Sequence, residues 1–214
     1  MSLKLSGHLQ SICTQRVLLT LAEKGVKDFE LVSVDFMTGE HKLPAYTEKH
    51  PFGLIPLLED GDFKLFESRA IARYIATKFH GQGSPLTPAP GDVQSWALFE
   101  QWASVEQNAF TAYADQILTQ KLWNGFRGLP TIEAALEDST SRLEAKLDIL
   151  DTIVGTQRYM GGKEFSLIDI YYIPIVNMLY KAGMGFLFDN RPNLKTWWGS
   201  VSNRPAWTKI LSSL

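Results

Sequence analysis

Two serines stand at the starts of predicted helices, where a hydroxyl group can meet a negatively charged partner. Ser11 precedes a helical pattern that begins near Ile12, and Ser68 follows Glu67 at the start of another. A helix N-terminus carries about half a positive charge and several free N–H donors, so either serine could hold an anion. The alternative is ordinary N-capping, which most serines at such positions provide.

Other polar side chains nearby could complete a binding site. Glu67 could hold an ammonium group while Ser68 holds a carboxylate, a combination that fits a zwitterionic amino-acid head group. His41 and Lys42, in the segment between two predicted strands, could receive a second carboxylate. The alternatives are favourable dipole placement for Glu67 and a solvated loop around His41.

Two more residues are candidates on local grounds. In Ile55-Pro56 the proline has no N–H for a strand neighbour, which leaves the backbone of Ile55 free to pair with another peptide. Cys13 lies in the first turn of a predicted helix and would be reactive if exposed. The alternative for Cys13 is a small buried apolar side chain.

The sequence lacks the motifs that several other kinds of active site require. No histidine pairs with another at metal-ligand spacing and Cys13 is the only cysteine, so no metal site is expected. Glycine-rich nucleotide-binding motifs and the G-x-S-x-G nucleophile motif are also absent from the sequence.

The composition is that of a globular protein with almost balanced charge. The 214 residues are 45% apolar and 21% charged, enough to build a substantial core. Lys and Arg total 21 against 23 Asp and Glu, a formal charge of −2, which disfavours nucleic-acid binding. One cysteine fits a reducing compartment, and no segment resembles a signal peptide or a membrane span. We therefore expect a cytoplasmic protein that binds neither nucleic acid nor membrane.

The candidate residues of the N-terminal part lie in an alternating pattern of strands and helices. The Asp60-Gly61 pair predicts a hairpin with a type I′ turn. The first two strands should be parallel, because a helix connects them, and the hairpin adds antiparallel ones. The predicted strands cover residues 4–7, 29–36, 55–59 and 63–66, and the predicted helices cover 12–24 and 67–79.

The sequence pattern of the remaining residues predicts a linker followed by helices. Residues 82–91 are rich in proline and glycine, which predicts the linker. Ser166 and Asp169 form an N-capping pattern, and Pro192 and Pro205 each open a shorter helix. Two long helices are expected over 92–122 and 131–154. The chain therefore divides into an α/β domain (1–81), the linker (82–91) and an all-helical domain (92–214).

Five motifs in series resemble those of the cytosolic glutathione transferases. They are G-H-x-x-S-x-x-T-x-R-V at 7–17, G-E-H-K at 39–42, H-P-F-G-x-I-P at 50–56, E-D-G-D-F-K-L-F-E-S-R-A-I at 59–71 and F-S-L-I-D at 165–169. The R-G-L-P-T stretch at 127–131 is similar to the phi class. This resemblance, which covers nearly the whole chain, implies a thioredoxin-like N-terminal domain, an all-helical C-terminal domain, glutathione as cosubstrate and a homodimer.

The resemblance also implies roles for single residues. Ser11 matches the catalytic serine, whose hydroxyl donates a hydrogen bond to the glutathione sulfur and favours its thiolate. Ile55 matches the residue whose backbone pairs with the cysteinyl unit, next to a cis-Pro56. Phe52 matches an aromatic side chain that enters a pocket of the partner subunit.

The two ends of glutathione have matching residues as well. His41 and Lys42 match residues near the glycine carboxylate, and Glu67 and Ser68 match the pair that holds the γ-glutamyl head group. Leu54 departs from the phi pattern, which usually has glutamine there. Because leucine has no amide group, one contact with glutathione is expected to be lost.

The second substrate should bind in an apolar pocket between the domains. Each side chain that we assign to this pocket has a place in the hydrophobic core as its alternative role. The residues assigned are Leu9, Ile12, Phe110, Tyr113 and Ile117.

Three functions compete. The first is a transferase that joins the glutathione thiolate to small hydrophobic electrophiles and extends to hydroperoxide reduction, which needs the same activated sulfur. The second is a non-catalytic ligandin that binds apolar molecules, to which Leu54 lends weight. The third is thiol reduction through Cys13, which stands two residues after the position that catalytic cysteines occupy in related classes.

Overall fold

The computed structural model describes residues 3–214, which form two compact units. The first unit contains the chain up to Thr87 together with Pro205–Leu214, and the second contains Pro88–Arg204. The predicted helical domain therefore extended too far. Its last helix, α11 (Pro205–Leu211), packs against the first helix of the chain instead.

The first unit is built on a four-stranded sheet with the strand order β2-β1-β3-β4. β1 and β2 pair in parallel and β3 and β4 form an antiparallel hairpin, both as predicted, and β3 also pairs with β1 in antiparallel orientation. β3 begins two residues later than predicted, because Pro56 has no N–H to bond with an adjacent strand. The strands are β1 (Leu3–Gly7), β2 (Phe29–Ser33), β3 (Leu57–Asp60) and β4 (Phe63–Phe66).

The hairpin between β3 and β4 has a different turn from the one predicted. Asp60 pairs with Phe63, so the two central residues of the turn are Gly61 and Asp62. Gly61 has a φ of 62°, but Asp62 is not among the residues with positive φ. A type I′ turn needs positive φ at both central positions, so that prediction was wrong.

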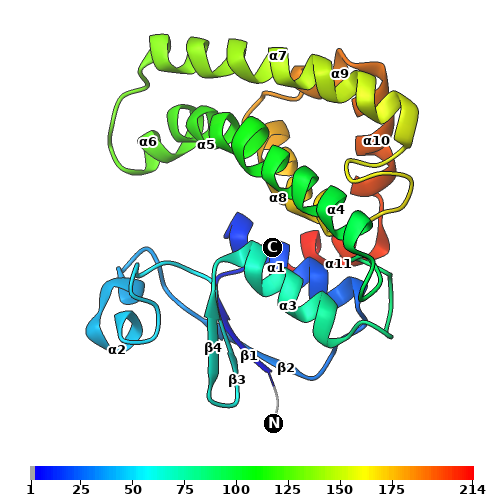
Figure 1. Cartoon of the computed structure of the whole chain (residues 1–214). Helices are drawn as coiled ribbons and strands as arrows, with labels where there is room; N and C mark the ends of the chain where they lie inside the picture. The colour runs from blue at the N-terminus through cyan, green and yellow to red at the C-terminus, as the bar shows by residue number, and fades with distance from the viewer. Residues whose placement is uncertain (1–2) are drawn as a thin grey trace. The chain divides into compact units, whose positions relative to one another are not determined.

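The described part of this unit contains three helices in addition to α11. α1 (Ile12–Glu23) and α3 (Ser68–Lys78) pack together beside the sheet, and α2 (Pro44–Thr47) lies apart from them, in the connection between β2 and β3 (Figure 1). A 3₁₀ turn at Glu40–Lys42 precedes α2 in that connection. The sequence pattern predicted α1 and α3 but indicated only a loop where the 3₁₀ turn and α2 stand.

The second unit consists of helices. The predicted helix over 92–122 is a continuous helical path from Val93 to Phe126, in which Glu106–Thr111 and Thr119–Trp123 are π-helical. The helices are α4 (Val93–Val105), α5 (Ala112–Leu118), α6 (Asn124–Phe126), α7 (Glu133–Gln157), α8 (Leu167–Lys181), α9 (Phe186–Asp189) and α10 (Pro192–Ser202).

Asp169 is the buried polar centre of the second unit. The predicted N-cap is a complete capping box, in which the Ser166 side chain caps α8 and the Asp169 carboxylate accepts from the Ser166 N–H at 3.0 Å. The same carboxylate accepts from the Met160 N–H at 2.9 Å and from Trp197 Nε1 at 2.8 Å. One side chain thus ties the start of α8 to α10 and to the segment before α8.

Candidate functional site

The strand register places three of the predicted site segments at one end of the sheet. Ser6 of β1 lies opposite Leu57 of β3, and Leu57 lies opposite Phe66 of β4. The chain therefore leaves or enters the sheet at neighbouring positions. The segments at this end are 7–11, 55–56 and 67–68.

Ser11 is the N-cap of α1. Its backbone is extended, with φ −75° and ψ 122°, and its Oγ accepts a hydrogen bond of 3.3 Å from the Thr14 N–H. The capping interpretation is therefore confirmed. Capping uses the oxygen only as an acceptor, and the Ser11 hydroxyl proton has no acceptor among residues 3–214. A partly exposed O–H donor thus remains available at the positive end of the helix.

The loop before Ser11 is held tightly against α1. A Cβ on Gly7 would lie 2.6 Å from Thr14 Oγ1, so only glycine lets the strand end approach the helix this closely. Gln15, buried on α1, donates from Nε2 to the Leu9 carbonyl at 2.8 Å, and the Ser11 N–H donates to the His8 carbonyl at 2.9 Å. These bonds fix the position of Ser11.

Ile55 keeps its backbone free, as the sequence indicated. The Ile55-Pro56 bond is cis, and neither the N–H nor the carbonyl of Ile55 bonds to another residue within 3–214. The preceding residue is anchored instead, because its carbonyl accepts a hydrogen bond of 2.8 Å from the Tyr46 hydroxyl. That residue, Leu54, exposes 49% of its surface. The segment thus offers an unpaired peptide unit beside a partly exposed apolar side chain.

Glu67 and Ser68 differ from the simple capping arrangement. Glu67 occupies the N-cap position of α3 without a side-chain capping bond, and its φ of 71° is a strained conformation for a residue with a side chain. Ser68 is the first residue of the helix, is 4% exposed and accepts a hydrogen bond of 2.6 Å from Nη1 of Arg16. Capping therefore does not explain Ser68, and its partner Arg16 was not among the predicted site residues.

Lys42 supplies the positive charge of the 40–42 turn. Burial, together with the neighbouring Lys42, lowers the pKa of His41 below its ordinary value, so His41 is neutral at pH 7. The Lys42 ammonium is exposed and donates to the Phe52 carbonyl at 3.3 Å. The turn also lies against Gly53, where a Cβ would come within 2.7 Å of the His41 carbonyl oxygen. His41 and Lys42 thus adjoin the chain that leads into Ile55.

Phe52 exposes 65% of its surface on the same segment. Its ring meets His50 and Phe66 edge-on, at centroid distances of 6.4 and 5.9 Å. A large, exposed aromatic ring held by two other rings is a candidate for contact with another chain.

The residues predicted for the second substrate fall into both units. Phe110 and Ile117 are completely buried in the second unit, where Phe110 packs on Tyr172 with ring centroids 4.6 Å apart. The structure therefore favours the core interpretation for these two. Leu9, Ile12 and Tyr113 are partly exposed.

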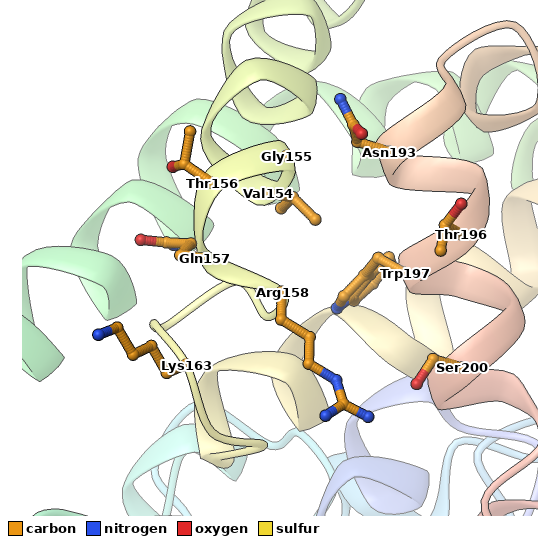
Figure 2. A pocket seen from close by; sticks show the side chains of 10 residues that line it. All are labelled: Val154, Gly155, Thr156, Gln157, Arg158, Lys163, Asn193, Thr196, Trp197 and Ser200. Carbon is orange, nitrogen blue, oxygen red and sulfur yellow. The ribbon is translucent and has the colours of Figure 1, made fainter.

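A cavity of about 670 Å³ lies in the second unit, and none of the predicted site residues is among those that line it. Figure 2 shows it between the end of α7 and α10. Within residues 3–214, no cluster of three or more His, Cys, Asp or Glu side chains is arranged to hold a metal ion. In the same range, no helix combines the length and apolar character needed to cross a membrane.

Comparison with known families identifies both parts of the chain. Residues 1–77 match the glutathione S-transferase N-terminal domain, and residues 107–205 match the C-terminal domain. The chain belongs to the glutathione S-transferase family. The transferase is 42% identical to glutathione S-transferase PM239X14 of Arabidopsis thaliana, over 93% of this chain and 91% of that relative.

Solved structures agree with this assignment. Glutathione transferase F7 from Populus trichocarpa is 38% identical, with a TM-score of 0.93 over 98% of both chains. Maize glutathione S-transferase I in complex with an atrazine glutathione conjugate is 31% identical, with a TM-score of 0.89 over 99% of this chain and 97% of that one. The predicted phi-class family, fold, transferase function and glutathione cosubstrate are thereby confirmed.

Proposed function

We propose that this transferase activates glutathione through the Ser11 hydroxyl. The observation that carries the proposal is the Ser11 O–H, which has no acceptor within residues 3–214 and stands at the N-terminus of α1. A hydrogen bond from this hydroxyl and the field of the helix would both stabilise a thiolate over a thiol. The thiol proton would pass to solvent, and the thiolate is the nucleophile.

The neighbouring segments supply the rest of the glutathione site. The unpaired peptide unit of Ile55 would bond with the cysteinyl unit of glutathione, and Lys42 beside neutral His41 would receive the glycine carboxylate. Glu67 and Ser68 would bind the ammonium and carboxylate of the γ-glutamyl group. Ser11, Ile55 and Ser68 support this arrangement because their segments begin side by side at one end of the sheet.

The second substrate would be a small hydrophobic electrophile. The thiolate attacks an electrophilic carbon, a carbon–sulfur bond forms, and the leaving group departs with the bonding electrons. With a hydroperoxide the thiolate attacks oxygen instead and releases the alcohol. A second glutathione then reduces the sulfenic acid formed on the first, giving the disulfide and water. The atrazine glutathione conjugate bound to the maize enzyme supports an apolar electrophile.

We also propose that the protein is a cytoplasmic homodimer. Phe52, exposed and braced by His50 and Phe66, would enter a pocket of the partner subunit. Twofold symmetry would then place the same contact on both subunits.

Two variants test the role of Ser11. Ser11→Ala should lower kcat/KM for conjugation of an aryl halide by about 10²–10³-fold, the typical loss when one preorganised hydrogen-bond donor to a developing anion is removed. Cys13→Ser should leave conjugation intact. The reverse pattern would assign the chemistry to Cys13 and contradict the proposal.

A ligandin is the second candidate, favoured by the half-exposed apolar side chain of Leu54. It predicts no conjugation of aryl halides, isothiocyanates or hydroperoxides by protein that retains bound glutathione. It also predicts that Ser11→Ala leaves the affinity for apolar ligands unchanged. Measurable turnover that disappears with Ser11→Ala excludes a purely ligand-binding protein.

A further inference from the structure

Arg16 connects α1 to the candidate head-group site. It is 1% exposed, and its Nη1 donates a hydrogen bond of 2.6 Å to Ser68 Oγ, across the α1–α3 interface of the first unit. The same nitrogen lies 3.7 Å from the sulfur of Cys13. A guanidinium is costly to bury, so a buried arginine that donates to the serine at the start of α3 calls for an explanation.

The direction of this hydrogen bond determines what Ser68 can do. A guanidinium carries only donors, so the oxygen of Ser68 must accept. The Ser68 proton then has to point elsewhere, and it has no acceptor among residues 3–214. Ser68 is thereby left as a hydrogen-bond donor at the start of α3, close to a buried positive charge. Both properties suit an incoming carboxylate.

We propose that Arg16 is a positioning residue, which orients the Ser68 hydroxyl as a donor to the α-carboxylate of the γ-glutamyl group of glutathione. The inference rests on the proposed role of Ser68 in binding that group. Arg16 acts through Ser68 and through its charge, and it does not touch the reacting sulfur. It therefore contributes to glutathione binding and not to the chemical step.

The competing explanation is that Arg16 only joins two helices. In that case its replacement would lower stability and impair every substrate alike. The two explanations separate when glutathione is compared with an analogue whose γ-glutamyl group lacks the α-carboxylate, because a positioning role depends on that carboxylate.

The experiment measures steady-state kinetics of Arg16→Met, Arg16→Lys, Ser68→Ala and the Arg16→Met/Ser68→Ala double variant with both thiols. Arg16→Met should raise KM for glutathione about tenfold, the lower end of the effect expected for a charged hydrogen bond, with kcat changed less than about twofold. Arg16→Lys should recover part of the loss. With the analogue, all of these variants should match the unsubstituted enzyme. The double variant should lose no more than the larger single effect.

Lys24 provides a matched control. It is another buried cation, at the C-terminal end of the same helix, where its Nζ donates to the Ser84 carbonyl at 2.9 Å. Lys24→Met should lower the melting temperature while leaving KM for glutathione unchanged. A rise in KM for glutathione in this variant equal to that of Arg16→Met would overturn the inference.

The remaining outcomes are also decisive. Equal losses with glutathione and with the analogue would make Arg16 a structural link only. If Ser68→Ala raises KM but neither Arg16 variant does, the inference fails while the proposed head-group site stands. If Ser68→Ala has no effect, the head-group site itself is wrong. Should Arg16→Met fail to fold, Arg16→Lys with the two thiols gives the same discrimination.

Discussion

The hydroxyl of Tyr46 donates a hydrogen bond of 2.8 Å to the carbonyl oxygen of Leu54. Tyr46 is buried on α2, and it fixes the backbone of the segment that leads into Ile55. The Leu54 side chain remains half exposed at the position where the phi pattern usually has glutamine. The backbone is thus anchored while the side chain offers no hydrogen bond.

Leu54→Gln should therefore tighten glutathione binding. A restored neutral hydrogen bond contributes about 0.5–1.5 kcal/mol, which corresponds to a decrease in Kd of roughly 2- to 12-fold. Isothermal titration calorimetry with glutathione measures this directly. Leu54→Met, which changes shape without adding an amide, is the control and should leave Kd unchanged. Equal affinities for all three proteins would show that position 54 makes no contact with glutathione.

Removal of the exposed Phe52 ring should break the proposed dimer. Phe52→Ser removes an apolar side chain that is 65% exposed, so the fold of the subunit should survive while the subunit contact weakens. Sedimentation velocity over a concentration series should show a shift from dimer to monomer. Phe126→Ser, a control with a similarly exposed ring in the second unit, should leave the oligomeric state unchanged. An unaltered dimer in Phe52→Ser would contradict the assignment.

His50 should make the protein less stable in mild acid. It is 2% exposed and stacked on Phe66, and burial lowers its pKa below the ordinary value of 6.5 despite the opposing charge of Glu67. Between the folded and unfolded pKa values the unfolded chain binds more protons, so the free energy of unfolding falls as the pH decreases through about 6.5. Above that range His50 is neutral in both states and causes no loss.

The His50→Phe variant checks this sign, since phenylalanine keeps the ring but cannot be protonated. Melting temperatures measured from about pH 7.5 to about pH 5.5 bracket the ordinary histidine pKa. The unsubstituted protein should lose more stability over this interval than the variant. His41, whose pKa is lowered for a similar reason, contributes in the same direction. Parallel curves for the two proteins would mean that His50 does not titrate as described.

Asp169 should be among the most sensitive positions for stability. Its carboxylate accepts three N–H donors, from Met160, Ser166 and Trp197. Asp169→Asn replaces one acceptor oxygen with an NH₂ group that faces a donor, which should cost about 2–4 kcal/mol of unfolding free energy. Asp138→Asn is the matched control.

The Asp138 carboxylate is exposed and pairs with Arg142 one helical turn away. Exposed pairs of this kind contribute about 0.3–0.5 kcal/mol, so the control should be nearly neutral. Urea unfolding curves give both values. A loss at Asp169 as small as at Asp138 would show that the capping box does not stabilise the second unit.

Features encoded by neighbouring residues could be predicted from the sequence. The capping box of Ser166 and Asp169, the helix that follows Ser11 and the β3–β4 hairpin depend on residues close together in the chain. The type of the hairpin turn was predicted wrongly, because the pairing of β3 with β4 determines which residues form the turn. The turn centres on Gly61 and Asp62 because the ladder extends to the Asp60–Phe63 pair.

Features that depend on distant residues could not be predicted in this way. Arg16 and Ser68 are 52 positions apart, and nothing in the local pattern of either residue indicates the other. The packing of α11 on α1 and the burial of Phe110 likewise result from tertiary contacts. A charged side chain directly before the apolar run at 17–19 was the available signal for Arg16, but its partner could be identified only from the structure.

We propose that Ser11 lowers the pKa of the glutathione thiol at the start of α1. Ultraviolet difference titration of bound glutathione reports the thiolate directly. The bound thiol should ionise well below its ordinary pKa of about 8.5, and Ser11→Ala should restore the solution value while Ser11→Thr should not. If the bound thiol of the unsubstituted enzyme titrates as it does in free solution, Ser11 does not activate glutathione.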